Sequence, residues 1–389
     1  MNTISIVLLG VYGASRMDPL IFAVVVVSMA VVHTFLDILP AIFLGAPDPD
    51  TALSILPGHR MLLDGRGLEA VRLSVMGSLG AVVLAACTTP LVVVALPALY
   101  PIVSTVMFPL LAFLEVSIIM TERDLAHILW AVVVLAASGF LGLVVMSSGL
   151  ISPQKGFFPA LSGLFGVSTL LLASRSGMSI PSQAVDWSTK LERRRTIRSV
   201  VVGFFCGMVT GVLPAVGSAH ATIMAQRVTG DGDHRSFIVS VSGVNTSNMI
   251  FGLVALYAIG KARNGAVKAV QQILGEVGDP QVLALLVSVA VACGGIGAFL
   301  TMLLGRGFAT NITKIPYDLL SRMVIAAVSF LVALECGWVG LLILASSTFI
   351  GLIPPLVGVK RVHCMGFLMV PTLMYFSGYH QWFLRLLLG

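Results

Sequence analysis

Charged residues are scarce in this chain. Only 10% of its 389 residues are Asp, Glu, Lys or Arg, whereas 57% are hydrophobic, and the mean hydropathy is +1.01. Soluble proteins carry about 25% charged residues, so the composition excludes an ordinary soluble domain and predicts a polytopic membrane protein. The net charge of +6 comes without a basic patch interleaved with aromatic residues, which argues against a nucleic-acid partner.

Cysteine and enzyme signatures are also lacking. The five cysteines are odd in number and far apart, so neither a disulfide framework nor a metal-binding knuckle is indicated. The chain has no His-Glu-x-x-His and no Gly-x-Ser-x-Gly sequence. We therefore expect a protein that is not an enzyme, with no catalytic residue, no bound metal and no cofactor other than a coupling ion.

What the chain has instead is a series of long apolar runs. Most of them can cross the roughly 30 Å of hydrocarbon in a bilayer, and the shorter ones suit half-helices. The runs are residues 19–36, 69–96, 102–120, 125–149, 157–173, 199–213, 236–259, 281–304, 321–335, 339–357 and 364–378. The sequence thus predicts an all-α polytopic bundle of about 11–13 helical segments in the cell membrane.

A basic stretch separates two largely apolar halves. It predicts a first membrane repeat at residues 1–175, a linker at 176–198 and a second membrane repeat at 199–389. Because basic loops stay in the cytoplasm, we place the loop 174–198 there. Threading the apolar runs outward from this loop leaves 17 of the 23 Lys and Arg residues on the cytoplasmic side.

The two halves of the chain resemble each other in sequence. Gly67 aligns with Gly265, and residues 113–115 align with residues 333–335 in the same order. The threading puts such partners on opposite sides of the membrane, which predicts two inverted-topology repeats with broken or re-entrant helices. The first repeat lacks the stretch that opens the second, so we expect the first repeat to be incomplete at its N-terminus.

The first half carries an interrupted apolar helix. His33 and Asp37 precede Pro40, and Gly45 and Pro47 follow it. Proline removes a backbone donor, so we expect the helix to unwind near Pro40, and unwound backbone at membrane depth survives only inside protein or beside a wet cavity. His33 and Asp37 share a helical face and form a candidate ion-coupling pair. The alternative is that both side chains lie in interfacial water at the helix end.

The second half has a similar interruption. Pro214, Ala215, Gly217, Ser218 and His220 are arranged as a proline break, a glycine turn and a cap for the next short helix. The N-terminus of such a half-helix carries about half a positive charge, which predicts a bound carboxylate or phosphate. We expect these five residues, with Gly45 and Pro47 of the first half, to bind substrate. An ordinary proline kink is the alternative.

Polar residues inside other spans complete the candidate set. Asn245, Thr246 and Asn248 belong to a run of four polar residues in a spanning segment, which is costly unless they hydrogen-bond. We expect them to face the substrate, and Asn245 also to take part in ion coupling; hydrogen bonding between helices alone is the alternative. Glu115 and Glu335 lie in equivalent helices and are candidate carriers of the coupling Na⁺ or H⁺. Interfacial solvation of both glutamates is the alternative.

Several of these motifs resemble those of one family. Residues 43–47, 57–70, 158–166 and 213–217 are similar to the large membrane subunit of the tripartite tricarboxylate transporters. Residues 33–37 with 45–48 and 363–366 resemble the archaeal branch of that family. The resemblance implies a permease of two inverted repeats that takes up carboxylates with an ion gradient, usually with a small membrane subunit and an extracytoplasmic binding protein. Ala215 departs from the glycine that bacterial members usually have there.

The leading hypothesis is therefore an ion-coupled secondary transporter for small organic anions, surrounded by membrane lipid. A flippase for a polyprenyl phosphate or a similar lipid is a second transport hypothesis, because helix ends that bind phosphate would serve it too. An intramembrane metal-dependent hydrolase, with His33, Asp37 and His220 as metal ligands, ranks last.

Overall fold

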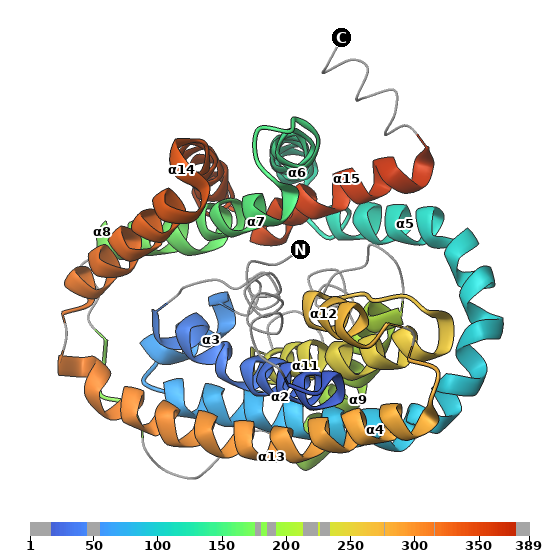
Figure 1. Cartoon of the computed structure of the whole chain (residues 1–389). Coiled ribbons are helices and arrows are strands. Elements are labelled where there is room, and N and C mark those ends of the chain that lie inside the picture. The colour runs from blue at the N-terminus through green and yellow to red at the C-terminus, as the bar shows by residue number, and fades with distance from the viewer. Residues whose placement is uncertain are drawn as a thin grey trace. The chain divides into compact units, whose positions relative to one another are not determined.

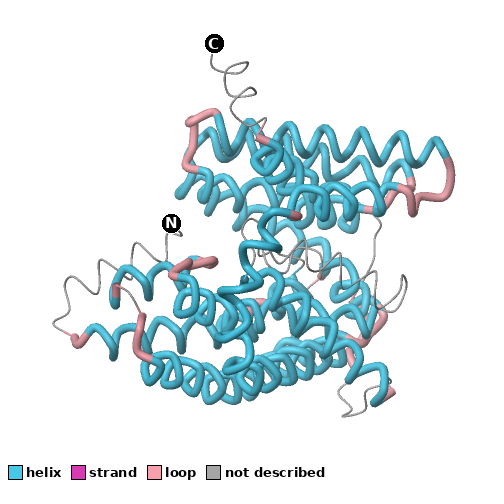
Figure 2. Tube along the Cα trace, turned by 90° about the vertical axis from the view of Figure 1, so that its right-hand side faces the viewer, coloured by secondary structure: helices cyan, strands magenta, loops and turns pink. Residues whose placement is uncertain are grey.

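The computed structural model of the chain is helical throughout the part that it describes (Figures 1 and 2). It describes residues 17–44, 55–175, 180–184, 192–212, 225, 234–275, 277–314 and 316–378, and these contain helices and loops but no strand. Eight of the helical stretches are long and apolar enough to cross a membrane: Pro19–Leu44, Gly67–Ile102, Leu125–Ser147, Lys155–Leu172, Arg193–Val212, His234–Ile259, Pro280–Lys314 and Asp318–Val357. The predicted all-α, multi-pass membrane class is confirmed.

The helices form two compact units, and each unit draws on both halves of the chain. Unit 1 consists of Met1–Phe43, Leu56–Ser104 and Ile180–Lys314, and unit 2 consists of Leu44–Ile55, Thr105–Ser179 and Ile315–Gly389. This division differs from the predicted repeats, which follow one another along the sequence. That residues 1–175 and 199–389 are two related membrane repeats stays a prediction.

Unit 1 is built around one buried helix. Its elements are α2 (Pro19–Leu36), η1 (Pro40–Leu44), α3 (Ile55–Leu63), α4 (Gly67–Thr105), α9 (Arg193–Val212), α11 (His234–Ile259), α12 (Gly265–Leu274), α13 (Pro280–Asn311) and η4 (Ile312–Lys314). Nearly every side chain of α11 between Ser236 and Leu256 is buried. Gly203, Gly207 and Gly211 of α9 let that helix approach α11 closely, as small residues do in membrane helix pairs.

The end of α2 corrects one expectation. The helix does not unwind at Pro40, because after a turn at Asp37 it continues as the π-helix η1 from Pro40 to Leu44. A π-helix bonds each N–H one residue further back than an α-helix does, and such widened turns are frequent at functional sites. The missing N–H of Pro40 therefore coincides with a change of helical register rather than with extended backbone.

Unit 2 contains the remaining helices. They are α5 (Met107–Ile119), α6 (Leu125–Ser147), α7 (Pro153–Leu161), η3 (Ser162–Val167), α8 (Ser168–Arg175), α14 (Tyr317–Val357), η5 (Arg361–Met365) and α15 (Gly366–Ser377). The apolar runs 321–335 and 339–357 are joined in α14, which is interrupted at Gly337 with φ 64°. Only glycine adopts this backbone conformation without strain, so the interruption is built into the sequence.

The packing inside unit 2 is reciprocal between the two halves. In α6, the Ser138 hydroxyl donates to the carbonyl of His363 at 3.2 Å, before the start of α15. In α14, the Ser347 hydroxyl donates to the carbonyl of Pro159 in α7 at 3.3 Å. Ser138 and Ser347 each stand four residues before a glycine, Gly142 or Gly351, that meets the backbone of the same partner segment. A helix from each half thus packs on the other half in the same way (Figure 1).

Two loop pairings agree with the threading of the chain through the membrane. In unit 1, the Gln183 amide bonds both the carbonyl of Leu62 and the N–H of Gly67, so the linker meets the start of α4. In unit 2, the turn after α5 meets the segment before η5 through Glu122 and the backbone N–H of Lys360. The threading puts both members of each pair on one side. That this side is cytoplasmic stays a prediction.

Candidate functional site

The structure joins the interrupted end of α2 to the polar centre of α11 through one hydrogen bond. The Asn245 side-chain amide donates from Nδ2 to Oδ2 of Asp37 at 2.6 Å. Asp37 is 6% exposed and Asn245 is 4% exposed, and the two residues come from different halves of the chain. An ionisable side chain buried at a helix distortion inside a membrane protein marks a functional site by default.

The neighbours of Asn245 on α11 use their hydroxyls within the protein. Thr246 donates to the carbonyl of Ser242 at 3.1 Å, and Ser247 donates to the carbonyl of Gly243 at 2.7 Å, both inside the same helix. The Ser242 hydroxyl donates to Oγ of Ser74 in α4 at 2.8 Å. Of the predicted set, Thr246 is therefore fully buried with its donor engaged, and Asn248 is half-buried. Through its bond to Asp37, Asn245 reaches the other half of the chain.

His33 and Asp37 do not share one environment. The imidazole of His33 is exposed, whereas the Asp37 carboxylate is buried against α11. The two residues are joined by a backbone hydrogen bond of the helix, in which the Asp37 N–H donates to the His33 carbonyl at 3.0 Å. The spacing of four residues is compatible with a side-chain pair, but the turn at Asp37 directs the carboxylate to Asn245 instead.

Seven predicted substrate-binding residues lie outside the described residues. They are Gly45, Pro47, Pro214, Ala215, Gly217, Ser218 and His220. Their part in the site stays a prediction.

The two candidate glutamates differ in burial. Glu115 is 6% exposed in α5 of unit 2, whereas Glu335 is exposed in α14, two residues before the interruption at Gly337. The Lys155 ammonium donates to the backbone carbonyl of Glu335 at 3.4 Å. The sequence similarity between the two halves therefore places the two glutamates in comparable helices, but their side chains have different surroundings.

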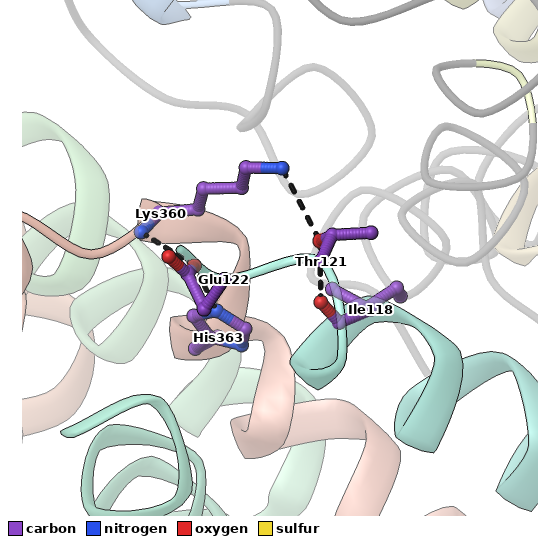
Figure 3. Close-up of polar contacts among 5 residues, drawn as sticks. All are labelled: Ile118, Thr121, Glu122, Lys360 and His363. Atoms are coloured by element: carbon purple, nitrogen blue, oxygen red, sulfur yellow. Dashed lines mark hydrogen bonds and ion pairs between the residues drawn. The ribbon is translucent and has the colours of Figure 1, made fainter. Parts of the chain in front are cut away.

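A buried carboxylate–imidazole pair in unit 2 was not expected as a pair (Figure 3). Glu122 Oε1 lies 2.8 Å from Nε2 of His363 and accepts the backbone N–H of Lys360 at 3.1 Å. The Lys360 ammonium turns the other way, to the hydroxyl of Thr121 at 3.2 Å. In the sequence, His363 stands out only as part of a family motif, and Glu122 has the pattern of a solvated loop residue. Only the return of the chain at 360–363 brings them together.

This pair predicts a pH-dependent stability. A carboxylate only accepts, so Nε2 of His363 carries the proton, and Nδ1 is buried without a hydrogen-bond partner in the described part of the chain. Burial lowers the pKa of His363 from 6.5, although Glu122 acts in the opposite direction. A second proton on Nδ1 would have no acceptor. As the pH falls below 6.5 the unfolded chain binds this proton first, so stability falls by up to about 1.4 kcal/mol per pH unit.

The measurement is the thermal midpoint of the purified protein between about pH 5 and pH 7. The matched variant His363→Gln keeps an N–H donor for Glu122 but cannot titrate. We expect the midpoint of the unaltered protein to fall more steeply with acid than that of the variant. Equal slopes would contradict the assignment.

Comparison with known proteins agrees with this architecture. The model of the tripartite tricarboxylate transporter TctA family matches residues 1–366. An uncharacterized protein of the archaeon Methanocaldococcus jannaschii is 25% identical over 387 residues, which cover 96% of this chain and 92% of that protein. No solved structure matches the chain. Because the family match covers nearly the whole chain, this multi-pass membrane protein belongs to the tripartite tricarboxylate transporter TctA family.

Proposed function

We propose that the chain is an ion-coupled secondary permease for small organic anions, carboxylates above all. Membership of the family supports a permease of the tricarboxylate-transporter type and a transporter rather than an enzyme. Beyond the family, the hydrogen bond between Asp37 and Asn245 carries the proposal. It joins an interrupted helix of one half to a polar span of the other, as inverted-repeat transporters require at their binding site.

Asp37 is proposed as the ion-coupling group. An ionised aspartate within a membrane span is costly, by about 2.5–3.5 kcal/mol at the membrane centre even on the lenient insertion scale, so a buried one calls for a compensating role. The Asp37 carboxylate, which accepts from Nδ2 of Asn245, supplies hard oxygen ligands of the kind that Na⁺ takes, and a carboxylate alone is enough to carry H⁺. His33, Glu115 and Glu335 remain candidates for additional proton or cation steps.

The anion is proposed to bind at helix N-termini near the bilayer midplane. Pro214, Ala215, Gly217, Ser218 and His220 would supply backbone N–H groups and a cap, as half-helices do in other transporters. Gly45 and Pro47 would supply the matching loop of the first half, with Thr246 and Asn248 nearby on α11. The family further suggests a small membrane subunit and an extracytoplasmic binding protein as partners in the cell membrane.

The test is uptake by the purified chain in proteoliposomes. Labelled citrate, with unlabelled di- and tricarboxylates as competitors, is offered under a Na⁺ gradient, under a pH gradient and under neither. We expect accumulation under one gradient and only slow equilibration without it. Uptake that ignores both gradients would contradict ion coupling, and accumulation of no carboxylate in the panel would contradict the substrate class.

A further inference from the structure

A second polar cluster lies in unit 1 where α11 ends. The Lys261 ammonium donates to the phenol oxygen of Tyr100 at 3.1 Å, and the Arg263 guanidinium donates to the same oxygen at 2.9 Å. Both cations also lie over the Tyr100 ring, at 4.6 Å and 5.3 Å from its centroid. The positively charged side chains of Lys261 and Arg263 therefore both contact one neutral side chain, Tyr100 of α4.

The charges of these two cations are not balanced within the described part of the chain. Among the described residues, no carboxylate pairs with Lys261 or Arg263, and Nε of Arg263 is buried without a hydrogen-bond partner. Asp279, the nearest acidic residue along the described chain, caps α13 by accepting the N–H of Gln281 at 2.8 Å. Arginine and lysine left in this state suit an anionic oxygen cluster such as a phosphate.

An apolar groove runs close to this cluster. It has a volume of about 580 Å³, lies between α4 and α13, and reaches Tyr257 near the end of α11. Three hydroxyl-bearing side chains line it: Thr89, which donates to the carbonyl of Ala85, Ser288, which donates to the carbonyl of Ala284, and Tyr257. The other lining residues are alanine, proline, valine and leucine, so most of the wall offers a ligand hydrocarbon contacts.

The groove and the cation cluster lie close together along the chain, both at the end of α11 and along α4. Tyr257 lines the groove, and Lys261 follows four residues later, just beyond the end of α11 at Ile259. Val93 also lines the groove, and Tyr100 follows on α4 after about 10 Å. Of the groove's own lining residues, Pro90, Ala284 and Val291 are exposed and belong to apolar spans. The groove thus opens toward hydrocarbon, and the two cations lie beyond it, after the end of α11.

We infer that this surface binds a membrane lipid with a phosphate headgroup. One hydrocarbon chain occupies the groove between α4 and α13, and the phosphate binds Lys261 and Arg263 beside Tyr100. An apolar wall beside two cations that have no acidic partner among the described residues fits an amphiphile with an anionic head, and anionic lipids attract basic residues at the membrane surface. Neither a soluble anion nor a neutral lipid uses both parts.

The test measures thermal stabilisation of delipidated full-length protein in detergent, with native mass spectrometry to count bound lipids. The additives are phosphatidylglycerol, phosphatidylcholine and inorganic phosphate, each alone. We expect phosphatidylglycerol to bind and stabilise and the other two to have little effect. Equal effects of phosphatidylcholine would overturn the role of the cations, and equal effects of inorganic phosphate would overturn the role of the groove.

Variants separate the two parts of the site. Lys261→Gln with Arg263→Gln should weaken phosphatidylglycerol binding by about 10-fold or more, because charge-assisted hydrogen bonds are lost. Ala284→Trp, at an exposed position in the groove, should weaken it with both cations intact. Lys268→Gln, which removes an exposed charge from α12, is the control and should bind normally. Normal binding by Ala284→Trp, or a loss in the control equal to that of the double variant, overturns the inference.

Discussion

Replacing Asp37 by Asn is expected to abolish gradient-driven accumulation of the substrate while leaving the protein folded. The amide is nearly isosteric with the carboxylate, and its oxygen still accepts the bond from Asn245, which is 2.6 Å in the native protein. It cannot carry a negative charge, however, so the affinity for a coupling cation should fall about 10- to 100-fold. Accumulation in proteoliposomes under the productive gradient measures this loss.

Two further variants sharpen the result. Asp18→Asn lies at the other end of α2, where Asp18 caps the helix by accepting the N–H of Leu20 at 2.8 Å. Because Asn caps as well as Asp does, this control should transport normally.

In the exchange variant, Asp37→Asn is combined with Asn245→Asp, which returns a carboxylate to the same contact. Partial recovery is expected, and full accumulation by Asp37→Asn alone would show that Asp37 is not the coupling group.

The second large effect is expected from the paired glycines of unit 2. A Cβ at Gly142 would lie 2.0 Å from the carbonyl oxygen of Phe367, and one at Gly351 would lie 2.3 Å from that of Leu164. Backbone cannot yield as a flexible side chain does, so Gly142→Ala and Gly351→Ala should each cost about 1–3 kcal/mol or more. The thermal midpoint in detergent should fall by a similar amount for both.

The control for these variants is Gly295→Ala in α13, where a Cβ meets no atom within 4 Å. Alanine is a better helix former than glycine by up to about 1 kcal/mol, so this variant should be unchanged or slightly more stable. If Gly142→Ala destabilises and Gly351→Ala does not, the two halves do not pack equivalently, and the reciprocal arrangement described for unit 2 is wrong.

The helix class and most spans could be predicted from the apolar runs, because hydrocarbon leaves few alternatives to the helix. The meeting of Asp37 with α11 was also within reach, since each half carries a costly polar interruption that needs a partner. The packing of α6 and α14 of unit 2 on segments of the other half of the chain was harder to predict. Residues 136–143 and 345–352 match in sequence, with Ser138 and Gly142 against Ser347 and Gly351, and this signal was available in the sequence.

Other features depended on contacts that no local pattern encodes. Proline at position 40 predicts an interruption, but whether the chain unwinds or widens into a π-helix depends on the packing around η1. The link between Glu122 and His363 spans 241 residues, and the two cations on Tyr100 come from the loop after α11. In each case the residue type was visible in the sequence and its partner was not.

The interleaving of the two units has a consequence for biogenesis. Neither unit contains a complete set of helices until the second half of the chain has been synthesised, because both draw on residues after 180. The helices that are synthesised first are therefore made before the helices that cover their packing faces. The partners against which α2 and α4 pack, α13 and α11, are made only late in translation, so we expect the insertion machinery to hold the earlier segments until then.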